Sequence, residues 1–436
     1  MNKHKRSTFS GKLGFVLSAA GASVGLGNIW RFPYLAAKYG GGIFLLIYII
    51  LALTFGYTLI MAETSLGRMT RKSPVGAFGN FGKSRFIFLG GWVIKYLIEY
   101  FSGHSKALAG DTYFTSFISN GISTEICFLI FTLFTLGIIY AGVRNGIERV
   151  SKFMMPILIV LSLIIAVYSV TRPGAIEGVK YFLVPNFEHF SWMTVVSAMG
   201  QMFYSLSIAM GILITFGSYM KKDTSIEKST ENVEIFDTAI AIMAGLMIIP
   251  AVFAFSGGDA ATLKSGPALM FITIPKVFAN MGFGTAIGIV FFLLVLFAAV
   301  TSSIALTESA VSTFEDELHW SRRKSTVFMG VIMILLGTLS CLGYGPLADF
   351  KILGMQFLDF FDFMTNSVMM PIAAIATCLL VSKVVGVDKL EKEITKDGQP
   401  FRRKKIFCFM IKYLCPFFAA IILISSVANA FGIITM

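Results

Sequence analysis

The sequence of 436 residues contains few charged residues: only 14% are Asp, Glu, Lys or Arg, while 56% are hydrophobic. A soluble protein of this length needs more polar surface to cover its core, so the composition excludes an ordinary soluble domain. Long apolar runs alternate with short polar loops, which predicts a polytopic membrane protein. The basic start "MNKHKRSTFSGK" is not followed by a short apolar core and a cleavage site, so we expect no removable signal.

Residues that carry metal or redox chemistry are also scarce. The histidines fall in predicted loops or helix ends and have no nucleophile beside them, which is evidence against an enzyme. The cysteines are odd in number, lack metal-ligand spacing and lie mostly in or beside apolar runs, so we expect neither a disulfide nor a metal site from them. These residues are His4, His104, His189 and His319, and Cys127, Cys341, Cys378, Cys408 and Cys415.

Ten apolar segments have the length of about 20 residues that a helix needs to cross a membrane. They lie near residues 12–37, 41–66, 123–142, 150–171, 193–219, 234–257, 282–311, 325–343, 352–382 and 406–433. An eleventh candidate, "RFIFLGGWVIKYLIEYF", is short and carries Lys95 and Glu99, whose i, i+4 spacing allows an ion pair.

The positive charges favour counting this eleventh segment as a span. With it, most of the 36 lysines and arginines fall on one side; without it, basic loops fall on both sides, against the positive-inside rule. We therefore predict eleven helices in the plasma (inner) membrane, with the N-terminus cytoplasmic and the C-terminus extracytoplasmic. Since the basic residues are spread over six loops, the net charge of +12 predicts membrane topology and no nucleic-acid partner.

Two spans contain residues that break a helix. The stretch "GASVGLGNIWRFPY" lies in the first span and "GQMFYSLSIAMG" in the sixth, which is the spacing of an inverted repeat with two discontinuous helices. Unwound backbone in a membrane is tolerated where it lines a polar cavity, and there it can bind a carboxylate and a small cation. The alternative is that the glycines only allow close helix packing, which explains one segment more readily than the pair.

These motifs carry a resemblance to a known family. "GxxVGLGNIWRFPY", "KYGGGIFLLIY", "YSLS" and "AAVTSSIA" resemble the neurotransmitter:sodium symporter family, in its bacterial eleven-helix branch. The resemblance implies one all-α transmembrane domain over residues 1–436 with a LeuT-like fold, an inverted 5+5 repeat (12–171 and 193–382), broken helices 1 and 6, and an extra helix at 406–433. It implies a sodium-coupled amino acid symporter in the lipid bilayer that works by alternating access and can form a homodimer.

The resemblance also implies two sodium sites built from oxygen ligands, which suit a hard cation. The first would use Ser23, Asn28, Ser205, Asp237 and the substrate carboxylate. The second would use Gly21, Val24, Ala298, Thr301 and Ser302. For Thr301 and Ser302 the alternative is an ordinary hydrogen bond to a helix carbonyl.

Asp237 is an acidic residue within an apolar helix, a position that usually faces a polar cavity. Many family members have asparagine at the similar position, and related members that require chloride bind it nearby. A fixed carboxylate implies that this chain does not require chloride. It stays open whether Asp237 contacts sodium directly or only balances its charge. The alternative to both is that Asp237 is simply an interfacial residue at the start of a helix.

The remaining site residues follow from the same resemblance. An outer gate would combine Arg31, Asp362, Gln201, Phe203 and Tyr204, and an inner gate Arg6, Asp316, Ser218 and Tyr219, although Arg6 could also be a topology charge. Substrate contacts would come from Ala22, Ser23, Val24, Gly25, Gly27, Phe203, Tyr204, Ser205, Ser207, Ala209, Ser302 and Leu306. The apolar pocket expected around Ala209 favours a neutral, hydrophobic or aromatic amino acid such as tyrosine.

The third helix departs from the family pattern. By comparison with the family, about 25 residues are absent before "GGWVIKYLIEYF", including a stretch that normally brings a tyrosine hydroxyl to the substrate. The apolar run that is left, Phe86 to Ile94, spans only about 14 Å as a helix. The alternative to a working symporter is therefore an impaired or non-transporting member that acts at most as a binding or regulatory membrane protein.

Overall fold

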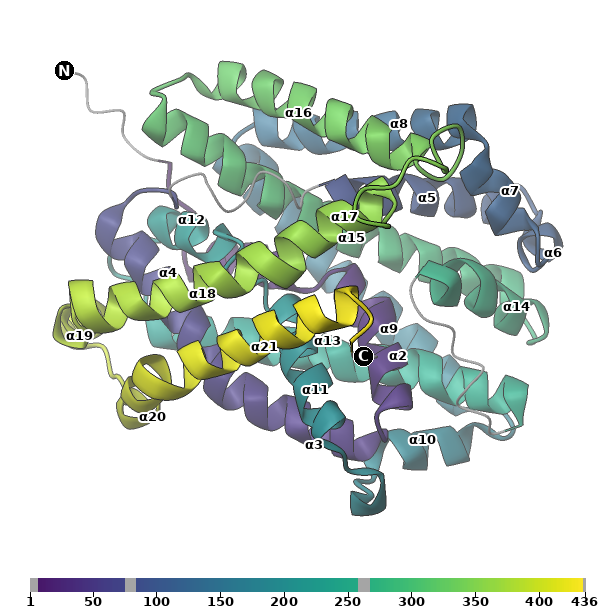
Figure 1. Cartoon of the computed structure of the whole chain (residues 1–436), viewed down its shortest axis with the longest axis horizontal. Coiled ribbons are helices and arrows are strands. Elements are labelled where there is room, and N and C mark those ends of the chain that lie inside the picture. Colours follow the sequence, from purple (N-terminus) through teal and green to yellow (C-terminus); the bar gives the residue numbers. More distant parts are fainter. Residues whose placement is uncertain (1–6, 75–83, 258–266, 434–436) are drawn as a thin grey trace.

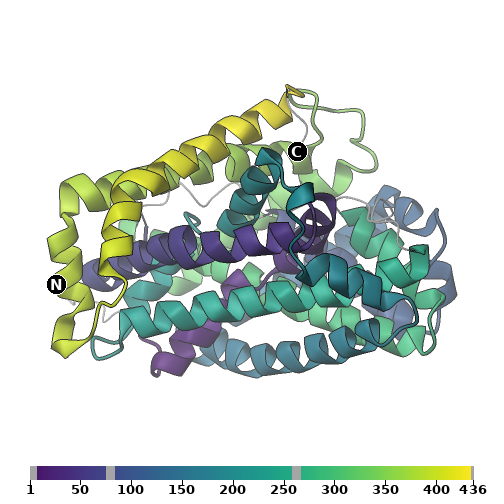
Figure 2. The same ribbon diagram turned by 90° about the horizontal axis from the view of Figure 1, so that it is seen from below.

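The computed structural model describes residues 7–74, 84–257 and 267–433. In these ranges the regular secondary structure is helical, apart from the isolated bridges Gly41–Pro185 and Ile352–Met355. The long helices run side by side along a common direction (Figures 1 and 2). The all-α prediction is confirmed.

Eight continuous helical segments of the described chain are long and apolar enough to cross a membrane. They are α3–η2–α4 (Gly42–Leu51, Ala52–Gly56, Tyr57–Thr70), α8 (Gly121–Tyr140), η3–α9 (Val143–Glu148, Arg149–Val170), α13 (Ile226–Ser256), α15 (Gly284–Glu317), α16 (Arg322–Leu342), α17–η7–α18–η8 (Phe357–Asp362, Phe363–Met369, Met370–Leu379, Leu380–Val385) and α20–η10–α21 (Lys404–Phe409, Met410–Leu414, Cys415–Ala430). Their bounds agree with the apolar segments of the sequence to within several residues. A bent pair, α1 (Lys12–Ser23) with η1 and α2 (Gly27–Arg31, Phe32–Lys38), passes the same test as one span.

The short eleventh segment forms a complete helix, α5 (Ser84–Phe101). Its 18 residues extend about 27 Å at 1.5 Å per residue, so the helix is longer than the apolar run alone suggests. The predicted pair is confirmed, because Lys95 Nζ lies 2.5 Å from Glu99 Oε1. The charge of Lys95 is therefore balanced within the helix that carries it.

Short helices connect the long ones. They are α6 (Ser105–Leu108), α7 (Tyr113–Ser119), α10 (Ala175–Leu183), η4 (Phe187–His189), η6 (Leu269–Thr273), α14 (Ile274–Ala279), α19 (Val387–Ile394) and η9 (Lys396–Gly398). Figure 1 shows α6, α7 and α14 at one end of the long helices and α19 at the opposite end.

Glycines bring α4 against the short helix α12 (Ile212–Tyr219). A Cβ atom on Gly67 would lie 2.0 Å from the carbonyl oxygen of Ile214, and one on Gly217 would lie 2.4 Å from that of Thr64. The two backbones therefore touch without a side chain between them, as small residues allow in membrane helices. This contact couples α12 closely to α4.

We expect Gly217→Ala to destabilise the protein, because the added methyl group has to displace the backbone of α4. Forcing a methyl group into a packed contact costs about 1–3 kcal/mol. The midpoint of thermal unfolding of the purified protein should fall. Gly137→Ala in α8 is the matched control, since nothing lies within 4 Å of its Cβ position; an equal fall in both variants would contradict this packing argument.

Candidate functional site

The first span is broken where the sequence predicted. Helix α1 ends at Ser23, the N–H of Val24 still donates to the carbonyl of Ala20 at 2.7 Å, and the chain then bends by 52° before continuing. The second part begins as a π-helical turn at Gly27. Backbone groups around residues 22–26 therefore leave the regular pattern inside the buried core.

The sixth span is broken too, between α11 (Trp192–Ser205) and α12. Ser207, Ala209 and Gly211 have φ values of 54°, 61° and 75°. For the two residues with side chains, this left-handed conformation costs about 1–3 kcal/mol each. The two breaks meet, because the hydroxyl of Ser207 donates to the carbonyl of Ala22 at 3.2 Å.

Asp237 lies between the two breaks. It is fully buried, and its Oδ1 accepts from Asn28 Nδ2 at 2.8 Å and from Ser205 Oγ at 3.0 Å. Its Oδ2 accepts from Ser205 Oγ at 2.9 Å and from the hydroxyl of Tyr48 at 3.1 Å. Three of the four residues that the resemblance assigned to the first sodium site are thus in direct contact.

The position of Asp237 differs from the sequence expectation in one respect. Helix α13 begins at Ile226, eight residues before the expected start, so Asp237 is the twelfth residue of a 31-residue helix. The alternative of an interfacial Asp at a helix start is therefore wrong.

Tyr48 was missed by the sequence analysis. It lies in α3 and is fully buried, and its hydroxyl donates to Asp237 and also to Ser205 Oγ, at 3.2 Å. The "KYGGGIFLLIY" motif ends on this residue, but a tyrosine in an apolar run gives no signal of its partner.

The cluster also contains a buried oxygen atom that has no hydrogen-bond partner. Asn28 uses its amide nitrogen for Asp237, while its Oδ1 is buried with no hydrogen-bond partner. An unpaired buried carbonyl oxygen is costly unless something else satisfies it. Beside a carboxylate, a small hard cation is the natural partner.

The residues assigned to the second sodium site lie on α1 and α15. Ser302 Oγ donates to the carbonyl of Ala22 at 3.2 Å, and a Cβ on Gly21 would lie 3.3 Å from Thr301 Cβ. The hydroxyl of Thr301 donates to Phe297 at 3.0 Å and to Ala298 at 3.2 Å, the ordinary helix hydrogen bond. Gly21, Val24, Ala298, Thr301 and Ser302 are all buried.

A second buried carboxylate, missed by the sequence analysis, faces the sixth span. Glu63 in α4 is fully buried, and its Oε1 accepts the N–H of Ala209 at 2.7 Å while its Oε2 has no partner. The carboxyl group of Glu63 therefore lies at the unwound segment, just before α12 begins.

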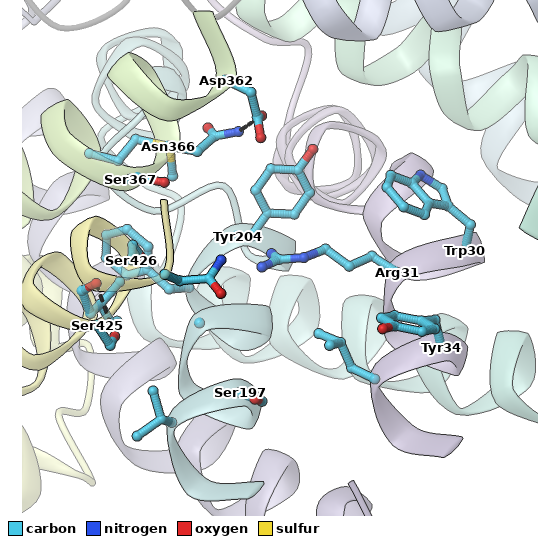
Figure 3. A pocket seen from close by; sticks show the side chains of 17 residues that line it. Trp30, Arg31, Tyr34, Ser197, Tyr204, Asp362, Asn366, Ser367, Ser425 and Ser426 are labelled. Atoms are coloured by element: carbon cyan, nitrogen blue, oxygen red, sulfur yellow. Dashed lines mark hydrogen bonds between the residues drawn. The ribbon is translucent and has the colours of Figure 1, made fainter. Parts of the chain in front are cut away.

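A cavity of about 380 Å³ opens beside the first break on the Arg31 side. Figure 3 shows Arg31 reaching into it below the ring of Tyr204, with Asp362 on the far side of that ring. The guanidinium carbon of Arg31 is 5.1 Å from the Tyr204 ring centre. The lining comes from α2 and η1, α11, α17–α18 and the last helix, and it comprises Trp30, Arg31, Tyr34, Leu35, Val196, Ser197, Gly200, Phe203, Tyr204, Asp362, Asn366, Ser367, Met370, Ile422, Ser425, Ser426 and Asn429.

This cavity brings together four of the five predicted outer-gate residues. The fifth, Gln201, is buried behind it, where its amide nitrogen donates to the carbonyl of Gly27 at 3.0 Å. Asp362 accepts a hydrogen bond from Asn366. Gln201 thus supports the π-helical turn of the first span.

Most of the predicted substrate contacts lie deeper than the cavity. Phe203 and Tyr204 line it, whereas Ala209 is buried beside Glu63 and does not belong to the lining. The pocket expected around Ala209 is therefore not the described cavity. The other predicted contacts are also packed in the buried core around the breaks, namely Ala22, Ser23, Val24, Gly25, Gly27, Ser205, Ser207, Ser302 and Leu306.

On the opposite side of the breaks, Asp316 in α15 accepts from the backbone N–H and the hydroxyl of Ser73, at 2.6 and 2.7 Å. Ser218 donates its hydroxyl to the carbonyl of Thr215. The predicted partner of Asp316, Arg6, lies outside the described residues.

The other predicted inner-gate residue, Tyr219, takes part in a charged cluster. Its hydroxyl donates to Glu308 at 2.6 Å, and the same carboxylate pairs with Arg322 at 2.6 Å. Glu308 is fully buried, and neither it nor Arg322 was predicted. The sequence shows Glu308 as a single charge in an apolar helix, but it does not show which residue of another helix balances that charge.

Comparisons with known proteins place the whole chain in one family of transporters. The sequence model of the sodium:neurotransmitter symporter family matches residues 6–120 and 93–433. The uncharacterized sodium-dependent transporter YhdH of Bacillus subtilis is 33% identical, and the alignment covers 100% of both chains. An uncharacterized sodium-dependent transporter of Haemophilus influenzae is 31% identical over 98% of this chain and 99% of its own length. The crystal structure of MhsT in complex with L-phenylalanine matches with a TM-score of 0.86 and 33% identity, covering 97% of this chain and 100% of MhsT.

Proposed function

The chain belongs to the sodium:neurotransmitter symporter family, and we propose that it couples uptake of a neutral amino acid with a hydrophobic or aromatic side chain to the inward movement of sodium. The observation that carries the proposal is the buried cluster of Asp237, Asn28 and Ser205, which joins the two broken spans. Unwound backbone and a fixed carboxylate meet there, away from water. This is the environment in which a cation and a substrate carboxylate can be bound together.

The first sodium ion is proposed to bind at Asn28 Oδ1 and the Asp237 carboxylate, with Ser205 and the carbonyl of Ser23 completing an all-oxygen site. The unpaired state of Asn28 Oδ1 supports this assignment. The second ion is proposed to bind between α1 and α15, at the carbonyls of Gly21, Val24 and Ala298 and the hydroxyls of Thr301 and Ser302. The hydroxyls of Thr301 and Ser302 donate their protons to carbonyls, which leaves the lone pairs of both oxygens available to the ion.

Three observations support the substrate class. Among the described lining residues of the cavity, Arg31 and Asp362 are the only charged ones and have opposite sign, so the lining is neutral overall and suits a zwitterion. Phe203, Tyr204 and Trp30 supply aromatic walls, which favour apolar and aromatic side chains. The similar MhsT was crystallised with L-phenylalanine.

We propose that alternating access opens the Arg31 side and the Asp316 side in turn, with the Arg31 side extracytoplasmic and the N-terminus cytoplasmic. The described structure has a cavity on the Arg31 side. On the other side, the chain before α1 covers α12, since Phe9 is buried and its N–H donates to the carbonyl of Tyr219 at 3.0 Å. This arrangement suits a state that receives substrate from outside.

The competing proposal is an impaired member of the family that lacks a normal third-helix wall. The observation that favours it is the length of α5, whose 18 residues include no tyrosine near the breaks: Tyr96 and Tyr100 pack against Phe292 instead. The two proposals predict different binding of substrate to the purified protein.

Sodium-dependent binding of labelled phenylalanine to the purified protein is the test. A working symporter should bind it at least tenfold more tightly in sodium than in potassium, and unlabelled tyrosine or leucine should compete. Because binding does not require turnover, weak binding that ignores sodium would establish the impaired alternative. Preferential competition by glycine or lysine would refute the proposed substrate class.

A further inference from the structure

A short segment after α4, Arg71–Pro74, lies against α12 and α15; we refer to it as the wedge segment. Helix α4 ends at Thr70, and Arg71 adopts a left-handed conformation with φ of 58°. A residue with a side chain pays about 1–2 kcal/mol for this conformation. The capping bond from the N–H of Arg71 to the carbonyl of Gly67, at 2.9 Å, offsets part of that cost, and the contacts of the segment add to it.

The first set of contacts is to α15. Ser73 donates its N–H and its hydroxyl to Asp316 Oδ2, and its hydroxyl also reaches the carbonyl of Ser312 at 3.2 Å. Thr313 Oγ1 donates to the carbonyl of Pro74 at 2.9 Å. Ser73 is buried, and the wedge segment is bound to little more than one turn of α15 by hydrogen bonds, including charge-assisted ones.

The second set of contacts is to α12 and the break before it. Arg71 Nη1 donates to the carbonyl of Ser218 at 3.1 Å. At the other end of α12, a Cβ on Gly211 would lie 2.6 Å from Pro74 Cγ and 2.9 Å from Ser309 Oγ. Pro74 therefore fills the space where the unwound segment, α12 and α15 meet.

We propose that the wedge segment is a plug of the inner gate and that Ser73 is the positioning residue that locks it to Asp316. The proposal rests on the transport function proposed above. Helix α12 packs backbone against backbone on α4 at the glycine contacts, and the wedge segment continues directly from α4. A path from the breaks to the Asp316 side between α12 and α15 requires the Ser73–Asp316 contact to break.

This role is separate from the one expected for Arg6. Asp316 was expected to pair with Arg6, which lies outside the described residues; its Oδ2 is also bound by Ser73, which follows the second span. Ser73 is neutral, so when it separates from Asp316 no buried positive charge loses its partner. This suits a contact that forms and breaks in each transport cycle. Ser73 and Asp316 should therefore be coupled energetically.

The experiment measures access to a cysteine placed beside the plug. Ser309→Cys is made in a background with the five native cysteines replaced by alanine, and a soluble maleimide is reacted with the full-length purified protein. Ser309 is buried next to Gly211, so the reaction should be slow. Ser73→Asp should raise the rate about tenfold, because two carboxylates repel each other at this partly buried contact.

Three further variants make the result specific. Asp316→Asn together with Ser73→Asp should return the rate towards that of the parent, since an amide can donate to the new carboxylate. Ser73→Ala, which keeps the backbone N–H, should raise the rate by a smaller factor of about three. Thr70→Asp adds the same charge at an exposed position and should leave the rate unchanged.

Size-exclusion chromatography identifies any variant that fails to fold. If Ser73→Asp fails to fold, the comparison of Ser73→Ala with the parent protein carries the test. Equal labelling rates in the parent, Ser73→Asp and Ser73→Ala proteins would overturn the plug, as would additive effects of Ser73→Asp and Asp316→Asn. The labelling assay requires neither sodium nor uptake. A protein that fails to transport can therefore still confirm the plug, and a transporting protein can still refute it.

Discussion

Replacing Asp237 with serine is expected to make substrate binding depend on chloride. The wild-type protein carries a fixed, fully buried carboxylate that is held by Asn28, Ser205 and Tyr48. That charge can compensate sodium, so exchanging chloride for gluconate should leave wild-type binding unchanged. Without the carboxylate, a buried cation lacks its partner, which costs several kcal/mol, and affinity in gluconate should fall about a hundredfold.

Chloride should restore a large part of the lost affinity in Asp237→Ser, because the same hydroxyl donors, Tyr48 and Ser205, can bind an anion in the vacated space. Isothermal titration with phenylalanine in sodium chloride and in sodium gluconate measures both effects. Asp388→Ser, the same change at an exposed residue in the first turn of α19, is the control. A wild-type protein that already requires chloride would show that Asp237 does not supply the compensating charge.

The sequence was sufficient for the fold because its strongest signals are local. Apolar runs of about 20 residues, basic loops and clustered glycines each depend on neighbours in the chain, so the spans and the first break could be located from residues alone. The start of α13 was misplaced because Glu227, Glu231 and Glu234 make its first turns look like a polar loop. In the fold these carboxylates face partners from the distant C-terminal region, such as Arg403 for Glu234.

Pairings between distant residues could not be predicted in the same way. Tyr48 and Glu63 lie in a predicted span whose sequence gives no sign of a binding site. Only the fold brings Tyr48 to Asp237 and Glu63 to Ala209. Asn28, Ser205 and Asp237 could be named together only from the resemblance to the family, because the fold of the family brings these positions together. The Ser73–Asp316 contact had no counterpart in the motifs and became visible only from the geometry.

The break itself explains why sodium and substrate should bind as a unit, and Asn28→Ala tests this. Asn28 holds Asp237 through its amide nitrogen and leaves its oxygen unpaired, two residues beyond the unwound backbone. At 4 Å two opposite charges attract by about 4 kcal/mol at an effective dielectric constant of 20. Linkage requires that each ligand raises the affinity of the other by the same factor.

We therefore expect Asn28→Ala to weaken phenylalanine binding and its sodium dependence together, each by at least about tenfold, since the variant loses a sodium ligand and also one of the three donors that hold the Asp237 carboxylate. Titrations with phenylalanine at a series of sodium concentrations give both quantities from one data set. Lys38→Ala, at the exposed end of α2 beyond the break, should change neither. If Asn28→Ala lowers substrate affinity but leaves the dependence on sodium concentration as it was, the two ligands are coupled elsewhere, and the unwound segment serves the substrate alone.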